Sequence, residues 1–155
     1  MSISFSTGYS NVAERILLTL WVGGMWMTGY VVTPLLFKVL DDRQLAGMIA
    51  GHLFTANSYI GLVCGGLLLL GVLVKCAGNR LKDSQVWMLV LMIIVIMVGQ
   101  FIIQPILAEL KAGGLPVGSK ESVEFGRIHG IASTLFLINS VLGLVLVGRG
   151  KIWSS

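Results

Sequence analysis

The chain has 155 residues, of which 55% are hydrophobic and 12% are charged, and its mean hydropathy is +0.90. Soluble domains carry about twice this charged fraction, and a chain this short could not enclose so much apolar surface in a water-soluble core. The net charge of +4 does not indicate a nucleic-acid partner, because the basic residues stand between apolar blocks, where they set membrane orientation. The composition therefore predicts a single integral membrane domain in contact with the lipid bilayer.

Four blocks without charged residues divide the sequence, and each is long enough for the roughly 20 residues of a spanning helix. We predict an all-α fold, a bundle of four transmembrane helices at residues 16–37, 55–74, 86–106 and 128–147. No internal repeat is evident. The first residues lack the basic segment and short apolar core of a cleavable signal peptide, so we expect the first span to direct insertion.

The second charge-free block, residues 44–74, is longer than one span requires. At about 1.5 Å per residue it would reach some 46 Å, against a hydrocarbon core of about 30 Å. Its first part places Leu45, Met48, Ile49, His52 and Leu53 on one helical face. We therefore predict that residues 44–54 form a short interfacial helix or a helical extension leading into the span, with one long tilted helix as the alternative.

Basic residues in the connecting segments predict the orientation. With a cytoplasmic N-terminus, the inner side carries Arg15, Lys75, Arg80, Lys82, Arg149 and Lys151, and the outer side carries Lys38, Arg43, Lys111, Lys120 and Arg127. This small excess on the inner side favours cytoplasmic N- and C-termini.

Polar residues collect near the outer ends of the predicted spans, where burial without a partner is costly and therefore indicates pairing or function. The candidates for a ligand or metal site are His52, Asn57, Gln100, Gln104, His129 and Ser133. Gln100 and Gln104 are one turn apart and share a helical face. Because both histidines of the chain fall at a similar depth, we predict one polar pocket between the helices in the outer half. Asn139, deeper in the last span, is expected to hydrogen-bond between helices.

Several chemistries are possible in such a pocket. Two neutral imidazoles could ligate haem b axially, or His52 and His129 could bind a copper-type metal with Glu109, Glu124 or Met48. The pocket could instead relay protons or bind a polar small molecule. The structural alternative is that the histidines hydrogen-bond to neighbouring amides and carbonyls and hold helix ends together.

The sequence contains no catalytic triad, phosphate-binding loop or C-x-x-C pair. We therefore predict a non-enzymatic membrane protein that binds a metal, a haem or a small ligand. One alternative is an accessory or scaffold subunit that packs against a membrane-protein partner or a second copy, with a purely structural polar cluster. A haem-dependent oxidoreductase is a further alternative.

Two segments resemble a family of small membrane proteins related to transmembrane protein 205. LWVGGMWMTGYVVTPLLFKVLDDRQLAGMIAGHLF (residues 20–54) resembles the first half of that family, and FGRIHGIASTLFLINS (residues 125–140) resembles its final helix. The corresponding positions are Gly24, Pro34, Phe37, Gly47, Phe54, His129, Gly130 and Asn139. The resemblance implies a four-helix protein of the bacterial inner membrane. The mammalian relative is associated with tolerance of platinum drugs, which implies a link to metals or small molecules.

Overall fold

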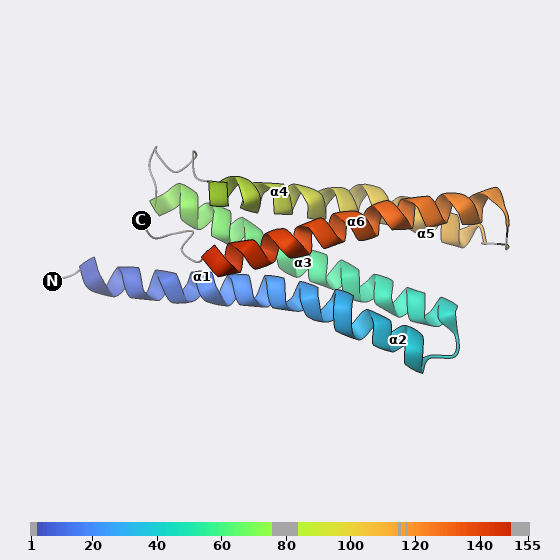
Figure 1. The fold of residues 1–155 in the computed structure, drawn as a ribbon. Helices are drawn as coiled ribbons and strands as arrows, with labels where there is room; N and C mark the ends of the chain where they lie inside the picture. The colour runs from blue at the N-terminus through green and yellow to red at the C-terminus, as the bar shows by residue number, and fades with distance from the viewer. Residues whose placement is uncertain (1–2, 76–83, 115, 117, 150–155) are drawn as a thin grey trace.

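The computed structural model describes residues 3–75, 84–114, 116 and 118–149, and the secondary structure of this part of the chain is entirely helical (Figure 1). The helices form four rods. The first rod comprises α1 (Ile3–Trp26), η1 (Met27–Val32) and α2 (Thr33–Val39), and the second is α3 (Arg43–Lys75); the third comprises α4 (Ser84–Val98), η3 (Gly99–Ile103) and α5 (Gln104–Ala112), and the fourth is α6 (Lys120–Arg149). The predicted all-α fold with four long helices is confirmed.

Each rod contains a segment that is long and apolar enough to cross a membrane. These segments are Val12–Val39, Arg43–Val74, Ser84–Ala112 and Lys120–Arg149. Each includes the span predicted at the same place, and each exceeds the roughly 20 residues that the hydrocarbon core requires. The chain is thus a multi-pass membrane protein whose apolar helices contact the bilayer. Of the basic residues used to predict its orientation, Arg80, Lys82 and Lys151 lie outside the described residues.

The second rod is one unbroken helix of 33 residues. A separate interfacial helix is therefore wrong, and the unbroken helix agrees with both a helical extension of the span and one long tilted helix. The helix is capped by Asp42, whose carboxylate accepts hydrogen bonds from the backbone N–H groups of Gln44 (2.8 Å) and Leu45 (3.1 Å). The buried face of its first turns is made by Ala46 and Ala50, whereas Leu45 and Met48 are exposed. Because Ala46 and Ala50 are small, α2 can approach α3 closely. Most of the predicted apolar stripe faces outward, toward lipid.

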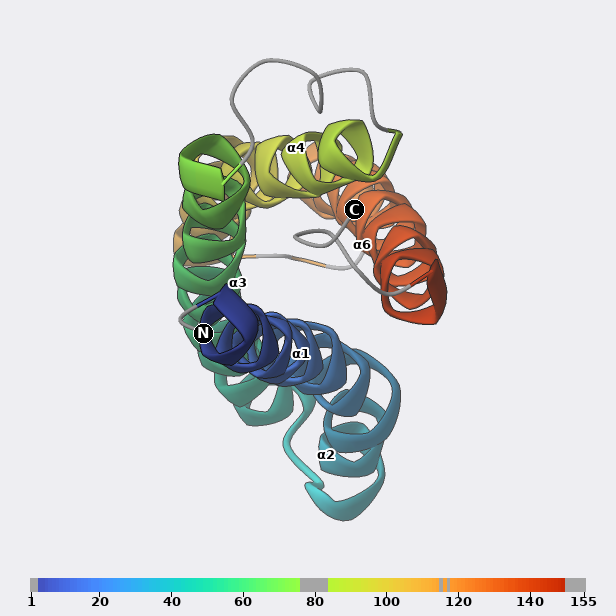
Figure 2. The same cartoon turned by 90° about the vertical axis from the view of Figure 1, so that its left-hand side faces the viewer.

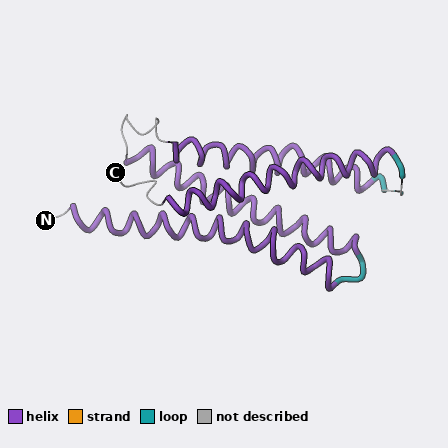
Figure 3. Tube along the Cα trace, in the orientation of Figure 1, coloured by secondary structure: helices purple, strands orange, loops and turns teal. Residues whose placement is uncertain are grey.

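At one end of the bundle, the terminal end, α1 and α4 begin and α3 and α6 finish (Figures 1 and 3). Here the rods close into a ring in which α1 contacts α3 and α6, and α4 contacts the same two helices (Figure 2). The core between them contains fully buried side chains from all four rods, among them Trp21, Leu68, Met92 and Leu146. Close packing in this half of the bundle leaves the helices little freedom to separate.

At the opposite end, the distal end, lie the connection at residues 40–42 and the C-terminus of α5. Here α2 packs against α3 and α5 packs against α6, while little backbone contact joins the two pairs. Figure 1 shows α2 and the start of α3 diverging from α5 and the start of α6. The molecule is therefore a closed four-helix bundle in one half and two separate helix pairs in the other.

The two π-helical segments mark the region where the pairs separate. Pro34 follows η1 and Pro105 follows η3, each at one of the first two positions of the next helix. A proline has no N–H, and its ring clashes with the carbonyl four residues earlier. A wider π-turn accommodates this: the N–H of Thr33 donates to the carbonyl of Thr28, and that of Gln104 to the carbonyl of Gly99.

These segments also share a short sequence pattern, which we call the short repeat. Residues 30–36 (YVVTPLL) and 101–107 (FIIQPIL) each contain an aromatic residue, two β-branched residues, a polar residue, proline and two aliphatic residues. The first and third rods run in the same direction (Figure 1). The short repeat therefore places Thr33 and Gln104 at equivalent positions.

Candidate ligand-binding cavity

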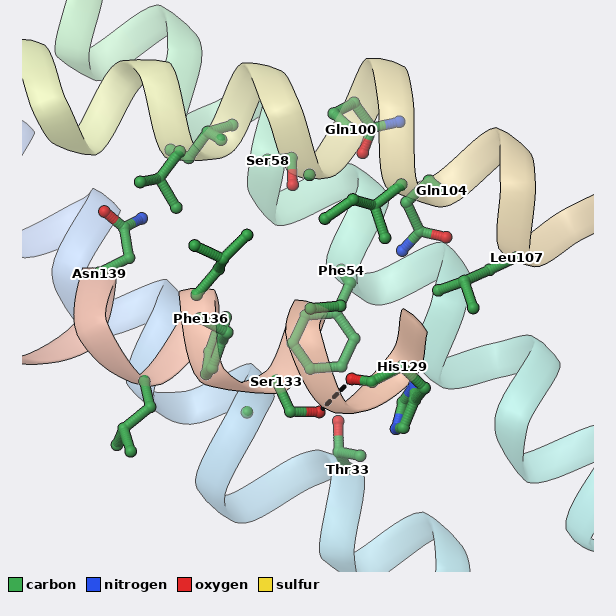
Figure 4. Close-up of a pocket in the computed structure, with 18 of the residues that line it drawn as sticks. Thr33, Phe54, Ser58, Gln100, Gln104, Leu107, His129, Ser133, Phe136 and Asn139 are labelled. Atoms are coloured by element: carbon green, nitrogen blue, oxygen red, sulfur yellow. Dashed lines mark hydrogen bonds between the residues drawn. The ribbon is translucent and has the colours of Figure 1, made fainter. Parts of the chain in front are cut away.

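A cavity of about 450 Å³ lies between the two helix pairs where they begin to separate. All four rods contribute to its walls (Figure 4). The residues that matter below are Gly29, Tyr30 and Thr33 of the first rod, Phe54 and Ser58 of α3, Gln100, Gln104 and Leu107 of the third rod, and His129, Ser133, Phe136, Leu137 and Asn139 of α6. This volume falls within the range of small-molecule sites, which also favour the junction between helices of a bundle.

The ring of Phe136 forms the centre of the cavity wall. It makes an edge-on contact with Phe54, with ring centroids 5.2 Å apart, and a tilted contact with Tyr30 at 5.8 Å. Gly29 leaves room for this ring, since a Cβ at that position would overlap it. One turn further along α6, the Trp26 indole N–H donates to the carbonyl of Ser140 at 3.3 Å and joins α1 to α6. The cavity therefore ends where the closed half of the bundle begins.

Asn139 is the most buried polar residue of the lining, with 3% of its surface exposed. Its Nδ2 donates to the sulfur of Met25 at 3.7 Å. A thioether can only accept, so this contact fixes the orientation of the amide, and the carbonyl oxygen Oδ1 has no hydrogen-bond partner. A buried acceptor without a partner costs about 1–3 kcal/mol. Asn139 thus makes the predicted interhelical contact through its amide nitrogen only, and its carbonyl oxygen has no partner.

A second amide oxygen in the same cavity has no partner either. The Oε1 atom of Gln100 is buried without a hydrogen bond. Two hydroxyl groups of the lining donate within their own helices: Thr33 donates to the carbonyl of Thr28 at 2.7 Å, and Ser133 to that of His129 at 2.9 Å. Residues on two walls of the cavity, Asn139 on α6 and Gln100 on η3, thus each hold a buried amide oxygen without a partner.

His129 lies at the distal edge of the cavity and is exposed. Its ring stacks on Phe125, one turn earlier, with centroids 5.8 Å apart and the planes 7° from parallel. On the same Phe125 ring lies the ammonium group of Lys111, 5.6 Å from the centroid. The cation–π contact between Lys111 and Phe125 joins α5 to α6. The stacking on Phe125 holds the His129 imidazole at the distal edge of the cavity.

The structure brings together four of the six predicted site residues, Gln100, Gln104, His129 and Ser133, with Phe54 and Asn139 from the resemblance. The other two do not line the cavity. His52 is exposed on α3, and the Oδ1 atom of Asn57 faces α1, 2.8 Å from where a Cβ on Gly24 would stand. The helices α3 and α6 lie diagonally across the ring, without extensive backbone contact. The two histidines therefore do not form one site.

The remaining positions that carry the resemblance do not line the cavity. Some pack where helices meet, and one has open space around it. A Cβ added to Gly47 would lie 3.8 Å from the Phe37 ring, where α2 meets α3. Pro34 follows η1. An added Cβ on Gly130 would meet nothing within 4 Å. Thr33 and Ser58 also line the cavity and were not predicted as site residues. For Thr33 the signal was its equivalence to Gln104 in the short repeat.

The lining does not suit a metal ion. The described residues that form it include no aspartate, glutamate, lysine or arginine, and His129 is their only histidine. In the described part of the chain no three histidine, cysteine, aspartate or glutamate side chains are grouped to hold a metal. Neutral amide and hydroxyl groups within an aromatic and aliphatic wall instead suit an uncharged organic molecule.

Fold and cavity together define a four-helix membrane protein with an uncharged, mostly apolar cavity between its helices. The chain belongs to the family described as Domain of unknown function (DUF4149), whose model matches residues 16–115. No curated protein and no solved structure matches the chain. The family match covers the first three rods from residue 16 onward, and the α6 residues of the cavity lie beyond it. A link to the family of transmembrane protein 205 is not shown.

Proposed function

We propose that the protein binds a small molecule in the cavity between its two helix pairs. The observation that carries this proposal is the uncharged cavity itself, whose lining includes Asn139 and Gln100, each with a buried amide oxygen that lacks a hydrogen-bond partner. If either amide turns toward the cavity, its oxygen can accept a hydrogen bond from a ligand, which would remove the cost of its burial. Because the two oxygens belong to α6 and η3 and all four rods form the wall, the bound molecule would also hold the pairs together.

Among the ligand classes that the sequence left open, a small organic molecule agrees best with the lining. Axial ligation of haem by two histidines would need His52 beside His129, and His52 is elsewhere. A copper-type site would need further sulfur, imidazole or carboxylate ligands, which the described lining does not contain. The amides and aromatic rings supply orientation and contact area for an organic ligand.

The proposal predicts that Asn139→Leu and Gln100→Leu lose a molecule that the wild-type protein retains. Leucine keeps the approximate size of the amide and removes its hydrogen-bonding groups. The protein is extracted in polymer-bounded native membrane discs, and bound masses are read by native mass spectrometry and solvent extraction. Asn57→Leu is the matched control, because it makes the same change on α3 outside the cavity lining and should retain the molecule.

Two outcomes would contradict ligand binding at this site. One is a wild-type protein that carries no bound mass, and the other is a bound mass that survives both cavity substitutions. Absorption spectra and metal analysis of the same samples detect a haem or a metal directly. A protein partner recovered in equal amount with an empty cavity would favour the accessory-subunit alternative.

We also propose that the protein resides in a bacterial inner membrane with both termini in the cytoplasm, in keeping with the resemblance to the transmembrane protein 205 family. The small excess of basic residues in the sequence segments expected on the side of the termini supports this orientation, which would put the distal end and the cavity in the outer half. Alkaline phosphatase fused after Ser155 should then be inactive, and a fluorescent protein fused there should fluoresce. The reverse result would place the cavity in the cytoplasmic half.

A further inference from the structure

We propose that ligands reach the cavity from the bilayer through a portal, the edge between α3 and the third rod, and that Gln100 is the gate of this portal. The inference rests on the proposed function and specifies the ligand class: an uncharged molecule dissolved in the lipid phase. A twofold relation between the two helix pairs makes the two edges of the cavity comparable, and the edges differ in the residues that close them.

The second helix pair repeats the first, element by element. Each pair consists of a rod that contains a π-turn and a proline, followed by an unbroken helix, α3 or α6, that returns. Counted from Pro34 and Pro105, equivalent positions of the first and third rods are both buried, in the pairs Leu18 with Leu89, Trp21 with Met92 and Met25 with Ile96. Counted from Gly65 and Gly143, α3 and α6 agree in the same way, in the buried pair Leu68 with Leu146 and the exposed pairs Ile60 with Ile138 and Val63 with Val141. The two pairs therefore present equivalent faces to the core and to lipid.

The contacts between the two pairs repeat as well. A Cβ on Gly65 would lie 2.9 Å from the side chain of Ile93 on the third rod. A Cβ on Gly143 would lie 3.1 Å from Val22, the residue of the first rod equivalent to Ile93. A second equivalent pair of contacts joins Gly61 to Ile96 and Asn139 to Met25. The two helix pairs are therefore related by an approximate twofold axis along the bundle, as in membrane proteins built from parallel repeats.

One edge of the cavity, between the first rod and α6, is closed by an aromatic ring. The Phe136 ring occupies the space that Gly29 leaves, and it contacts the ring of Tyr30 with centroids 5.8 Å apart. Because even a Cβ on Gly29 would overlap this ring, the edge has no room for a passing molecule. The twofold axis relates it to the opposite edge, between α3 and the third rod.

At the opposite edge, the twofold axis places Gln100 at the position equivalent to Gly29. It places Ser58 at the position equivalent to Phe136. Both Gln100 and Ser58 line the cavity (Figure 4). Ser58 is too small to fill the space of an aromatic ring, and no extensive backbone contact joins α3 to η3 or α5. The edge is therefore covered by the unbranched side chain of Gln100, which can change rotamer where a packed ring cannot.

The environment of Gln100 favours such a movement. Its Oε1 atom is buried without a hydrogen bond, although the residue as a whole is only partly buried. No hydrogen bond of this oxygen has to break when the side chain rotates and uncovers the cavity. Ser58 lies near the middle of the 33-residue α3, about 25 Å from either helix end, so the portal faces the hydrocarbon core. Charged groups are costly at this depth, and the portal therefore admits uncharged, lipid-soluble molecules.

Labelling of a cysteine inside the cavity tests the portal. In a background with Cys64→Ala and Cys76→Ser, Ala132→Cys reports from the cavity wall on α6, and the full-length protein is reconstituted in liposomes. The probes are lipid-soluble N-phenylmaleimide and a sulfonated maleimide that does not cross the bilayer. We expect Gln100→Gly to speed the reaction with N-phenylmaleimide about tenfold, because the gate is removed. Gln100→Gly combined with Ser58→Phe copies the closed edge and should react more slowly than the protein with the natural gate.

Three further variants control this experiment. Val141→Cys on the lipid-facing surface of α6 should react at one rate whatever residue stands at position 100. Asn57→Gly removes an amide on α3 outside the cavity lining and should leave the rate at Ala132→Cys unchanged. Gln100→Ala gives the same opening readout if a glycine or phenylalanine variant fails to fold.

Three results would overturn the portal. They are unchanged rates in both Gln100→Gly and Gln100→Ala, a Gln100→Gly/Ser58→Phe variant that reacts as fast as Gln100→Gly, and a sulfonated maleimide that reacts as fast as N-phenylmaleimide. The last result would indicate entry from water at the distal end. All three would leave small-molecule binding standing, because the mass bound to the wild-type protein is measured separately.

Discussion

Replacing Gly65 by alanine is expected to lower the free energy of unfolding by about 1–3 kcal/mol, the usual cost of overpacking a core. The fully buried Trp21 ring packs into a groove on α3 formed by Gly61 and Gly65. A Cβ on Gly65 would lie 3.0 Å from Cζ3 of Trp21 and 2.9 Å from Cγ1 of Ile93. The spacing of the two glycines therefore accommodates an indole ring from α1 and a side chain from α4.

The neighbouring glycine provides the matched control for this substitution. A Cβ on Gly66 would have no atom within 4 Å, so Gly66→Ala should leave the stability unchanged or raise it slightly through helix propensity. Unfolding in mixed detergent micelles measures both variants. In a Trp21→Phe background the cost of Gly65→Ala should shrink, because the outer atoms of the indole are gone and the two effects are coupled. Equal stability of Gly65→Ala and Gly66→Ala would show that Trp21 does not occupy this groove.

Hydropathy predicted the four rods because apolar length is the dominant constraint on a spanning helix. It also indicated that the second rod is longer than the hydrocarbon core. It could not show which face of that helix packs inward. The spacing of Leu45 and Met48 suggested one face, but the bundle buries Ala46 and Ala50, because close approach of α2 favours small side chains.

Depth along each helix was readable from the sequence, and four of the residues selected by depth, Gln100, Gln104, His129 and Ser133, line the cavity. The sequence did not show which face of each helix packs against the other helices. His52 has the expected depth, yet it lies on an exposed face of α3. The helix that carries His129, α6, lies diagonally opposite α3 in the ring. Matching depth without matching helical face is therefore insufficient to assign a shared site.

The separation of the two helix pairs could not be derived from hydropathy either. The pairs separate beside two π-turns. Each π-turn comes just before a proline, Pro34 or Pro105, within the short repeat. A proline in a spanning helix indicates a kink or an end at that residue, but neither proline alone indicates a π-turn or a separation of helix pairs. Recognising that the third rod repeats the same pattern would have indicated a paired opening at the level of Thr33 and Gln104.

Cysteine reactivity tests most directly whether a cavity between the helix pairs is open to small molecules. In a background with Cys64→Ala and Cys76→Ser, single cysteines are introduced at Ser133 in the cavity, at lipid-facing Val141 and at fully buried Leu146. The thiolate is the reactive form and needs water or polar surroundings to form. We predict that Ser133→Cys in native membranes reacts with N-ethylmaleimide roughly tenfold faster than Val141→Cys or Leu146→Cys. Equally slow reaction at all three positions would contradict an open cavity between the helix pairs.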